Sequence, residues 1–556
     1  MNIFVYTLKS DKMKKSRICA VSVVIIISSL ACNPKVVFTP DEEELFRQAE
    51  DNASAVNEGY DRCLKFLHGW LELADPETGL IPRNINDEKS RDIWNAQDCA
   101  ADNYPFMVLT SGLLDRNIFE GRMKEMLETE KKLTSRIGAM PDTWSFSKKG
   151  FARADTVLSD IIFGSAEYVK DGLIPLTEWL GPSPWSERLI AILDDIWKYA
   201  PADTPFGKIC SDNPEVNGDM LQALSRIYRM TGDKKYLDWA ERLGDYYLLG
   251  SNHPTNDFKV LRLRDHGCEI VSGLCELYAT VTFADTARRN LYRAPLYTML
   301  DRILEAGRNE DGLFYNSIDP VKGVPVNEGI ADNFGYTLNG FYTVYLLDKT
   351  EKYREPVNLA LSVLNQKYRN FAWEGKSHDG YADAIEGALN LYVREPVPSV
   401  KDWIESEIRV MWNKQQPSGI IEGWHGDGNF ARTTIMYCLW KTGGAYLIPW
   451  NNDLRYGGIY NNNKLYLTIS STKGWEGKLM PDIARHKEYM NLPLDWPRIN
   501  QFPEYFTVES GKTYTITTDN NRKEIVIGGD ELRNGFPVRL RPGESVRIII
   551  EQSLPE

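Results

Sequence analysis

The sequence lacks the features that identify several large classes of protein. It carries no long basic run, and its formal net charge is −13 over 556 residues, so nucleic acid is not an expected partner. No GxSxG turn, P-loop or dinucleotide-binding fingerprint occurs. The six histidines include no HExxH motif and no i, i+4 pair. We therefore predict no metal site, and no cofactor is implied.

Cysteines are few and are not arranged for metal binding. None of them forms a CxxC pair, and none has zinc-ligand spacing to a histidine. We expect those that follow Cys32 to be thiols packed in the core, which is the ordinary role of isolated cysteines. They are Cys63, Cys99, Cys210, Cys268, Cys275 and Cys438.

Aromatic and apolar residues, by contrast, are abundant. The chain is 42% hydrophobic and contains 15 Trp and 28 Tyr, which is enough to build a large core. Its length exceeds that of one ordinary domain, so we expect a large domain and a smaller one. Aromatic rings in open clefts also stack on the apolar faces of sugar rings. The composition therefore favours a carbohydrate partner without establishing one.

The N-terminal segment resembles a bacterial lipoprotein signal peptide. Three basic residues precede an apolar run over residues 20–30, which is too short for a comfortable membrane span. The sequence Leu-Ala-Cys-Asn at residues 30–33 then resembles a lipoprotein processing site. The resemblance implies a signal peptide over 1–32, lipid on Cys32, a tether over 33–41, and a membrane anchor in the cell envelope, on the periplasmic or the surface face of the outer membrane. An uncleaved anchor, or a true start at Met13, is the alternative.

From residue 42 to about 445 the apolar spacing predicts helices of two alternating kinds. One kind has charged exposed faces, and the other is more apolar, rich in small residues and preceded by a polar loop. The first set covers 120–137, 185–199, 234–249, 291–306, 351–368 and 400–414. The second covers 100–114, 158–180, 216–230, 269–281, 333–347, 381–393 and 430–442. The loops recur at roughly 45 to 65 residues, about one helical hairpin each.

This plan resembles the six-hairpin glycosidase superfamily. The phrases Tyr228–Tyr236 (YRMTGDKKY) and Tyr345–Tyr353 (YLLDKTEKY) partly echo each other, and each joins one helix of the apolar kind to one of the charged kind. The resemblance implies a mainly α fold, an (α/α)6 toroid over residues 42–445 in which the apolar helices are inner and the charged helices outer. Six or seven hairpins can be counted in this chain. A helical solenoid is the alternative.

Residues 446–556 follow a different pattern. Alternating or β-branched runs at 464–470, 505–508, 513–517, 524–527 and 545–551 are bounded by Gly, Asn-Asn and Pro-Gly turns. They predict an antiparallel β-sandwich domain, of the kind that braces many toroid glycosidases and lyases. Two segments between these strands, 475–478 and 495–498, are candidates for loops that reach the cleft, although bracing is the commoner role.

In a toroid, the loops that lead into the inner helices converge on one funnel. The most polar of them contains Arg264, Asp265 and His266 and is followed by Glu269. Glycoside hydrolysis needs two carboxyl groups, one protonated and one ionised. We expect one from Asp265 or Glu269, and the other from the set Asp98, Asp102 and Asp332. Taken singly, each of these acids also suits a helix cap.

The other polar residues of these loops are predicted to bind substrate. They are Arg264, His266, Asn103, Tyr336, Asp383, Trp424, His425 and Arg432. The cations among them favour a uronic acid at the cleaved end. The leading hypothesis is therefore a lipoprotein glycoside hydrolase with water as its second substrate.

Two other functions remain open at this point. The first is a polysaccharide lyase on the same plan, with Tyr336, Tyr381, His266 or His425 as the base. The second is a glycan-binding lipoprotein without catalysis, which needs the aromatic surface but not the carboxylates.

Overall fold

The computed structural model describes residues 38–519 and 524–553. The predicted signal peptide, Cys32 and most of the predicted tether therefore lie outside the described residues. In the described part, no helix is both long enough and apolar enough to cross a bilayer.

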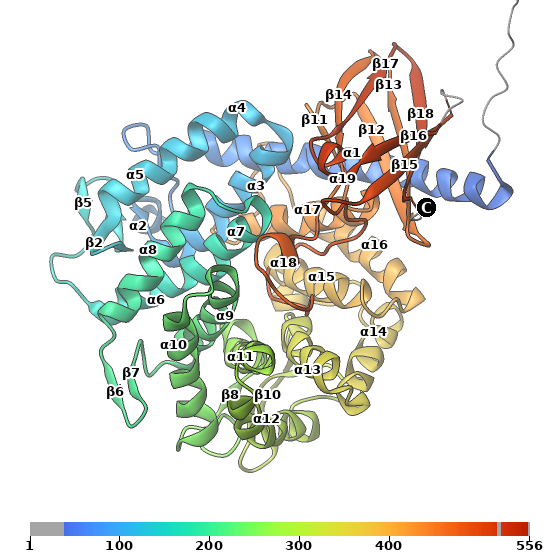
Figure 1. Ribbon diagram of the computed structural model, residues 1–556. Coiled ribbons are helices and arrows are strands. Elements are labelled where there is room, and N and C mark those ends of the chain that lie inside the picture. The colour runs from blue at the N-terminus through green and yellow to red at the C-terminus, as the bar shows by residue number, and fades with distance from the viewer. Residues whose placement is uncertain (1–37, 520–523, 554–556) are drawn as a thin grey trace, which may run out of the picture.

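Two concentric layers of helices form a closed ring (Figure 1). The inner layer is α3 (Tyr104–Leu114) with the π-helix η1 (Ala96–Asn103), α6 (Leu158–Glu167) with η3 (Tyr168–Leu173) and α7 (Ile174–Leu180), α9 (Pro214–Thr231), α11 (Glu269–Ala284), α13 (Phe334–Asp348), α15 (His378–Tyr392) and α17 (Asp427–Thr442). The outer layer is α1 (Pro40–Leu73), α5 (Lys124–Thr134), α8 (Pro184–Lys198), α10 (Lys234–Gly244), α12 (Thr286–Ala306), α14 (Glu355–Lys367) and α16 (Pro398–Trp412).

Each inner helix packs on the next around the ring, and α17 returns to α3 and α1. The described residues therefore contain seven inner and seven outer helices, which resolves the count of hairpins as seven. The predicted fold class, a mainly α toroid followed by antiparallel strands, is confirmed. All the predicted inner and outer helices are present, with ends shifted by a few residues.

Small residues explain why the inner helices can lie so close together. A Cβ on Gly218 of α9 would clash with the backbone of α11, and one on Gly335 of α13 would clash with Gly387 of α15. Such close backbone approach is available only to glycine. The outer helices instead expose charged residues on their outer faces. The first of them, α1, begins with a capping box between Thr39 and Glu42.

After α17, the chain forms two antiparallel sheets. One has the order β12 (Leu454–Asn461), β13 (Lys464–Ser471), β18 (Glu544–Gln552), β15 (Thr513–Thr518), β16 (Ile525–Gly528); the other has the order β11 (Tyr446–Ile448), β14 (Trp475–Met480), β17 (Phe536–Leu540). The strand expected at 505–508 does not form, because this segment makes only an isolated bridge from Thr507 to Asp482. The segment 475–478, a candidate loop, is instead strand β14.

Smaller strands edge the ring. They are β1 (Ile93–Trp94), β2 (Ser135–Ile137), β3 (Met140–Pro141), β4 (Trp144–Ser145), β5 (Gly150–Phe151), β6 (Ala202–Thr204), β7 (Gly207–Ile209), β8 (Leu261–Arg262), β9 (Tyr315–Asp319) and β10 (Val324–Ile330). Short helices are α2 (Glu88–Arg91), α4 (Arg116–Ile118), α18 (Arg485–Glu488) and α19 (Gly529–Leu532).

The segment 489–502, between β14 and β15, fills the middle of the ring; we call it the plug. Figure 1 shows α18 and the chain beside it in the centre of the inner helices. Trp496 is fully buried and packs with Ala279 of α11. Arg498 donates to Glu178 of α7 at 2.9 Å, and Asn390 of α15 donates to the Arg498 carbonyl at 3.2 Å. The plug therefore ties the sheet domain to the inner helices.

Candidate functional site

A cavity of about 250 Å³ lies at the N-terminal ends of the inner helices. Its wall is almost entirely polar, and its residues come from six of the seven hairpins and from the plug. They are Asp102, Lys170, Asp171, Asp265, His266, Glu269, Asn333, Tyr336, Glu374, Asp379, Asp383, Trp424, His425, Asn429, Arg432 and Asn500. Titratable groups of opposite charge crowd this central cavity, so it is the natural place for catalysis.

The first wall of the cavity is the π-helix η1, which carries Asp98 and Asp102 one turn apart. Asp98 accepts from Arg83 at 2.5 Å and lies 3.2 Å from Nε2 of His425. The carboxyl group of Asp102 makes no hydrogen bond to another side chain or backbone group of the described residues. Burial, reinforced by the negative charges of Asp171 and Asp379, raises the pKa of Asp102 well above its usual range. This shift favours the protonated form of Asp102, which faces the cavity.

The second wall is the π-helix η3, which carries Lys170 and Asp171. Both side chains are buried, and Lys170 Nζ donates to Asp171 Oδ1 at 2.7 Å and also to Glu269. Burial alone would raise the pKa of Asp171, but Lys170 and His266 outweigh it and hold the pKa below its usual value. Asp171 is thus an ionised carboxylate, although it is as buried as many neutral side chains.

Behind these carboxylates lies His266, placed by the loop that leads into α11. Its Nδ1 is 3.2 Å from Glu167 Oε2, and its Nε2 is 3.5 Å from Asp265 Oδ1. Burial alone would lower the pKa of His266, but Asp265 and Asp171 outweigh it and raise the pKa to about 10. Burial and Asp171 raise the pKa of Glu167 well above its usual range. At neutral pH, His266 is therefore an imidazolium.

On the opposite side, Arg432 of α17 is held by acids. It forms ion pairs with Asp383 at 2.6 Å and with Glu386 at 2.7 Å. Tyr336 donates its hydroxyl to the same two carboxylates, at 2.9 and 3.0 Å. Burial and these carboxylates, opposed by Arg432, raise the pKa of Tyr336 well above its usual range. Tyr336 therefore stays a phenol.

The plug contributes one residue, Asn500, to the floor of the cavity. Asn500 Nδ2 donates to Asp171 Oδ1 at 2.7 Å, and its Oδ1 accepts from Arg432 at 3.0 Å. Its backbone N–H donates to Glu386 at 2.7 Å. This residue adopts a left-handed backbone with φ of 59°, a conformation that asparagine tolerates better than most residues. Asn500 thereby links the ionised carboxylate to the arginine across the cavity.

Further acids and rings complete the wall. Burial, with Asp383 and Glu374, raises the pKa of Asp379 to about 7. The rings of Trp424 and His425 meet edge-on, with centroids 4.9 Å apart. Burial lowers the pKa of His425, so its imidazole is neutral at neutral pH.

The structure brings together most of the residues predicted to form the site. Asp102, Asp265, Glu269, His266, Tyr336, Asp383, Trp424, His425 and Arg432 all line the cavity. Asp98, Asp332, Arg264 and Asn103 lie just behind it or beside it: Arg264 pairs with Glu374 at 2.7 Å and lies 3.9 Å from Asp332. Asn103 is fully buried and its amide has no hydrogen-bond partner among the described residues.

Among the predicted catalytic acids, two are placed poorly for chemistry. The Asp265 side chain is 49% exposed and pairs with Arg262. Glu269 is buried between Lys170 and Gln222, which both donate to it. Neither is free in the way that Asp102 is.

Sequence reasoning missed Lys170, Asp171 and Asn500. The first two lie well inside their inner helix rather than in the loop before it. The signal was the clustering of Glu167, Lys170 and Asp171 in the middle of a largely apolar helix. Asn500 belongs to a segment that follows 495–498, which the sequence marked only as a candidate to reach the cleft.

Two groups of described side chains have ligand atoms within 4.8 Å of one another and could hold a metal ion. They are Asp98, Asp102 and His425, and Glu167, Asp171 and His266. In each group a cation of the chain already serves one carboxylate, Arg83 for Asp98 and Lys170 for Asp171. The charges can therefore be balanced without an ion, and the absence of a metal stays a prediction.

No protein-family model matches this chain, and no curated protein sequence matches it. Solved structures with some likeness include the GH76A α-1,6-mannanase of Salegentibacter sp. HEL1_6, which is 12% identical with a TM-score of 0.39 and covers 56% of this chain and 96% of that chain. A family 76 mannosidase of Bacteroides thetaiotaomicron VPI-5482 is 11% identical with a TM-score of 0.38, covering 69% and 98%. A polysaccharide lyase is 17% identical with a TM-score of 0.35, covering 49% and 88%. With scores this low, the matches carry no argument about the chemistry of this chain.

Proposed function

We propose that this protein is a glycoside hydrolase in which Asp102 is the general acid and Asp171 is the ionised partner. The observation that carries the proposal is that two carboxyl groups lie on adjacent walls of one cavity in surroundings that shift their pKa values in opposite directions. Burial and like charge keep the proton on Asp102, whereas Lys170 and Asn500 keep Asp171 ionised. Glycoside hydrolysis requires one carboxyl group of each kind.

In this mechanism Asp102 gives its proton to the glycosidic oxygen as the bond breaks. Asp171 acts on the other face of the sugar ring, either as the base that activates water or as the nucleophile. Lys170 and Asn500 touch Asp171 and hold it in place, and they act as positioning residues. Trp424 offers the cavity an aromatic face on which a sugar ring can stack.

For the substrate, the cavity favours a neutral sugar over the uronic acid expected from the sequence. The cations predicted to bind a substrate carboxylate are already engaged: Arg432 with Asp383 and Glu386, Arg264 with Glu374, and His266 beside Glu167. The cavity wall carries seven carboxyl groups, so a further anion would be repelled. The hydroxyl groups of a neutral sugar can accept from or donate to these side chains without that cost.

A lyase is the second candidate, and one observation favours it. His425 lines the cavity as a neutral imidazole, which is the form that can remove a proton. The other proposed bases are less suitable. Tyr336 is held as a phenol by two carboxylates, Tyr381 donates its hydroxyl to the Phe371 carbonyl at 2.7 Å, and His266 is already protonated.

The experiment that tests the proposal is turnover of a panel of neutral and uronic-acid oligosaccharides, following new reducing ends and the ultraviolet absorbance of unsaturated sugars together. We expect reducing ends without absorbance, and a loss on the order of a thousandfold in kcat for Asp102→Asn and for Asp171→Asn. Asp265→Asn, a half-exposed acid of the same cavity, is the matched control and should lose much less. Absorbance that is abolished by His425→Gln would replace the hydrolase with the lyase.

If the wild type binds oligosaccharides but neither it nor any variant turns over any of them, the third function, a glycan-binding protein, remains. In that case Asp171→Asn would bind oligosaccharides as the wild type does, and no product would appear with either.

For the N-terminus, we propose that Cys32 carries a lipid anchor and holds the enzyme in a bacterial cell envelope. The support is the pattern of basic residues, short apolar run and Leu-Ala-Cys-Asn sequence. Cys32→Ser should move the protein from the membrane fraction to the soluble fraction. Retention of the variant in the membrane fraction would contradict the anchor.

A further inference from the structure

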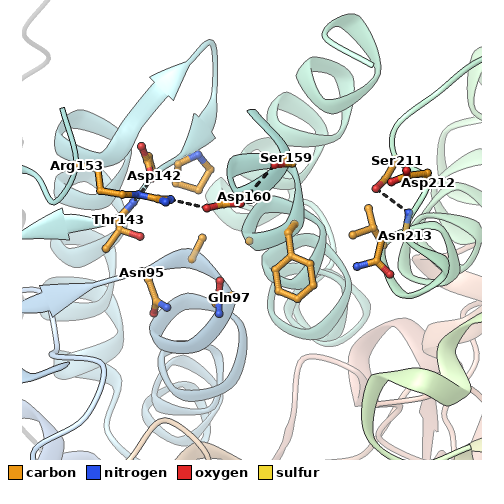
Figure 2. A pocket seen from close by; sticks show the side chains of 15 residues that line it. Asn95, Gln97, Asp142, Thr143, Arg153, Ser159, Asp160, Ser211, Asp212 and Asn213 are labelled. Carbon is orange, nitrogen blue, oxygen red and sulfur yellow. Dashed lines mark hydrogen bonds and ion pairs between the residues drawn. The ribbon is translucent and has the colours of Figure 1, made fainter. Parts of the chain in front are cut away.

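A second cavity, of about 330 Å³, lies on the same rim of the ring as the central cavity. It is bordered by the N-terminal ends of η1, α6 and α9, and by the strand connections near Asp142 and Arg153. Figure 2 shows Asn95 and Gln97 on one side, Arg153 reaching across to Asp160, and Ser211 to Asn213 in the loop that leads into α9. None of the catalytic side chains proposed above lines it.

Four charged residues line this rim cavity, Asp142, Arg153, Asp160 and Asp212, and three of them are held in ion pairs. Arg153 forms an ion pair with Asp160 at 2.6 Å, and Asp142 forms one with Arg136 at 2.8 Å. With Asp212 included, the lining groups and Arg136 carry an excess of negative charge, which disfavours an anionic sugar. The cavity therefore suits a neutral molecule.

Hydrogen-bonding groups of the wall are nevertheless free. The side chains of Gln97 and Thr143 line the cavity and make no hydrogen bond to residues 38–519 or 524–553. Half-buried Phe163 lines the same space with an aromatic ring. Free donors and acceptors beside one aromatic ring are what a sugar residue needs, because its edge is polar and its face apolar.

The wall of the rim cavity touches the wall of the central cavity at two places, so the two cavities are neighbours. Asn95 of its wall donates to Asp98, which lies 3.2 Å from His425 of the central cavity. On the other side, Glu215 is the neighbour of Val216 in the rim wall and lies close enough to His266 to raise its pKa.

The helices α6 and η3 run from the rim cavity to the central cavity, so their length gives the distance between the two cavities. Gly164 lines the rim cavity and Asp171 lines the central one, seven residues further on. At 1.5 Å per helical residue, this is roughly 10 Å. That separation is short enough for one glycan chain to reach both cavities.

We propose that the rim cavity is a distal subsite, which binds a further neutral sugar residue of the glycan whose cleaved end occupies the central cavity. The inference rests on the proposed function. Phe163 stacks on the sugar face, and Gln97 and Thr143 bond its hydroxyl groups. The enzyme is accordingly selective for chain length, and prefers oligosaccharides long enough to reach both cavities.

The test uses the size series, from disaccharide to hexasaccharide, of whichever neutral sugar the wild-type protein cleaves or binds. The kcat/KM of the wild type should rise with length until the rim cavity is filled and then level off. In Phe163→Ala, and in the double variant Gln97→Ala with Thr143→Ala, the ratio of kcat/KM for the longest to the shortest substrate should fall about tenfold. A flat length dependence in the wild type would overturn the subsite.

Two controls make the outcome specific. Phe283→Ala removes an exposed phenylalanine from the far end of α11, and it should leave the ratio unchanged. The double variant removes two surface groups and no packed ring, so it tests the subsite even if Phe163→Ala folds poorly. An unchanged ratio in the double variant and in Phe163→Ala would also overturn the proposal.

Failure of the subsite can be told apart from failure of the proposed function by calorimetry with Asp171→Asn. If this variant binds long oligosaccharides more tightly than short ones, and adding Phe163→Ala removes the difference, the subsite stands whatever reaction follows. If no neutral oligosaccharide binds, both proposals fail. Hydrolysis without any length dependence overturns the subsite alone.

Discussion

At the scale of single residues, charge placement decides which groups of the central cavity can do chemistry. Asp102 and Asp171 are both carboxyl groups with little access to water, and burial by itself would protonate both. Lys170, fully buried beside Asp171, is what separates them. The same principle fixes His266 as a cation, because Asp265 and Asp171 outweigh its burial.

His266 should therefore make the folded state sensitive to alkaline pH. Its pKa rises on folding from 6.5 to about 10, so its protonation stabilises the fold fully below 6.5, and that contribution is lost as pH rises through about 10. We expect the Tm of the wild type to fall more between neutral pH and pH 10 than the Tm of His266→Gln. Thermal unfolding across this range measures the difference.

His425→Gln serves as the control for this prediction. Burial lowers the pKa of His425, so its imidazole is neutral throughout the same range. Its replacement should leave the slope of Tm against pH as in the wild type. Equal slopes for all three proteins would refute the charge assigned to His266.

At the scale of elements, the ionised state of Asp171 depends on the plug as well as on its own helix. Asn500 reaches Asp171 from a segment 329 residues away in sequence. A hydrogen bond donated to a carboxylate favours its charged form and lowers its pKa.

Asn500→Ala should therefore shift the acidic limb of the pH profile of kcat/KM to higher pH, because Asp171 then needs a higher pH to ionise. The rate at the optimum should also fall, by about tenfold for one lost positioning bond. Asn491→Ala is the matched control: it removes an asparagine of the same plug, whose side chain donates to the Met230 carbonyl, away from the cavity. If Asn500 had a purely structural role, its replacement would lower the rate and leave the pH of the acidic limb unchanged.

The difference between local sequence patterns and long-range contacts explains which features the sequence could predict and which it could not. The inner and outer helices follow from local patterns of apolar, small and charged residues, so their order was predictable. Asp102 was found because it lies in the polar stretch at the start of an inner helix. Asp171 lies several turns inside its helix, where only the clustering of Glu167, Lys170 and Asp171 among apolar residues marked it. Asn500 reaches the site through contacts that no local pattern encodes.

The number of hairpins has a consequence for the whole molecule. Seven inner helices enclose a wider centre than six would. The side chains of the inner helices do not fill this space alone, so another segment must complete the packing. The plug supplies it: Met490, Leu492 and Trp496 pack against Ala279, and Ile499 packs against Tyr336 and Cys268. The sheet domain therefore completes the core of the ring, and its other contacts with α1 brace the outside.

If the plug is part of the ring's core, Trp496→Ala should destabilise the whole molecule as a core substitution does. Trp496 is fully buried, and its Nε1 lies 3.4 Å from Glu276. Removing it should cost about 3–5 kcal/mol of unfolding free energy, the range measured for buried aromatic residues. Denaturant unfolding followed by circular dichroism, which reports the helices of the ring, measures the loss. Tyr460→Ala is the control, because Tyr460 lies in the sheet domain and is 44% exposed. If Trp496→Ala instead shifted only a minor transition and left the helical signal at its wild-type midpoint, the plug would be an attachment to the ring and no part of its core.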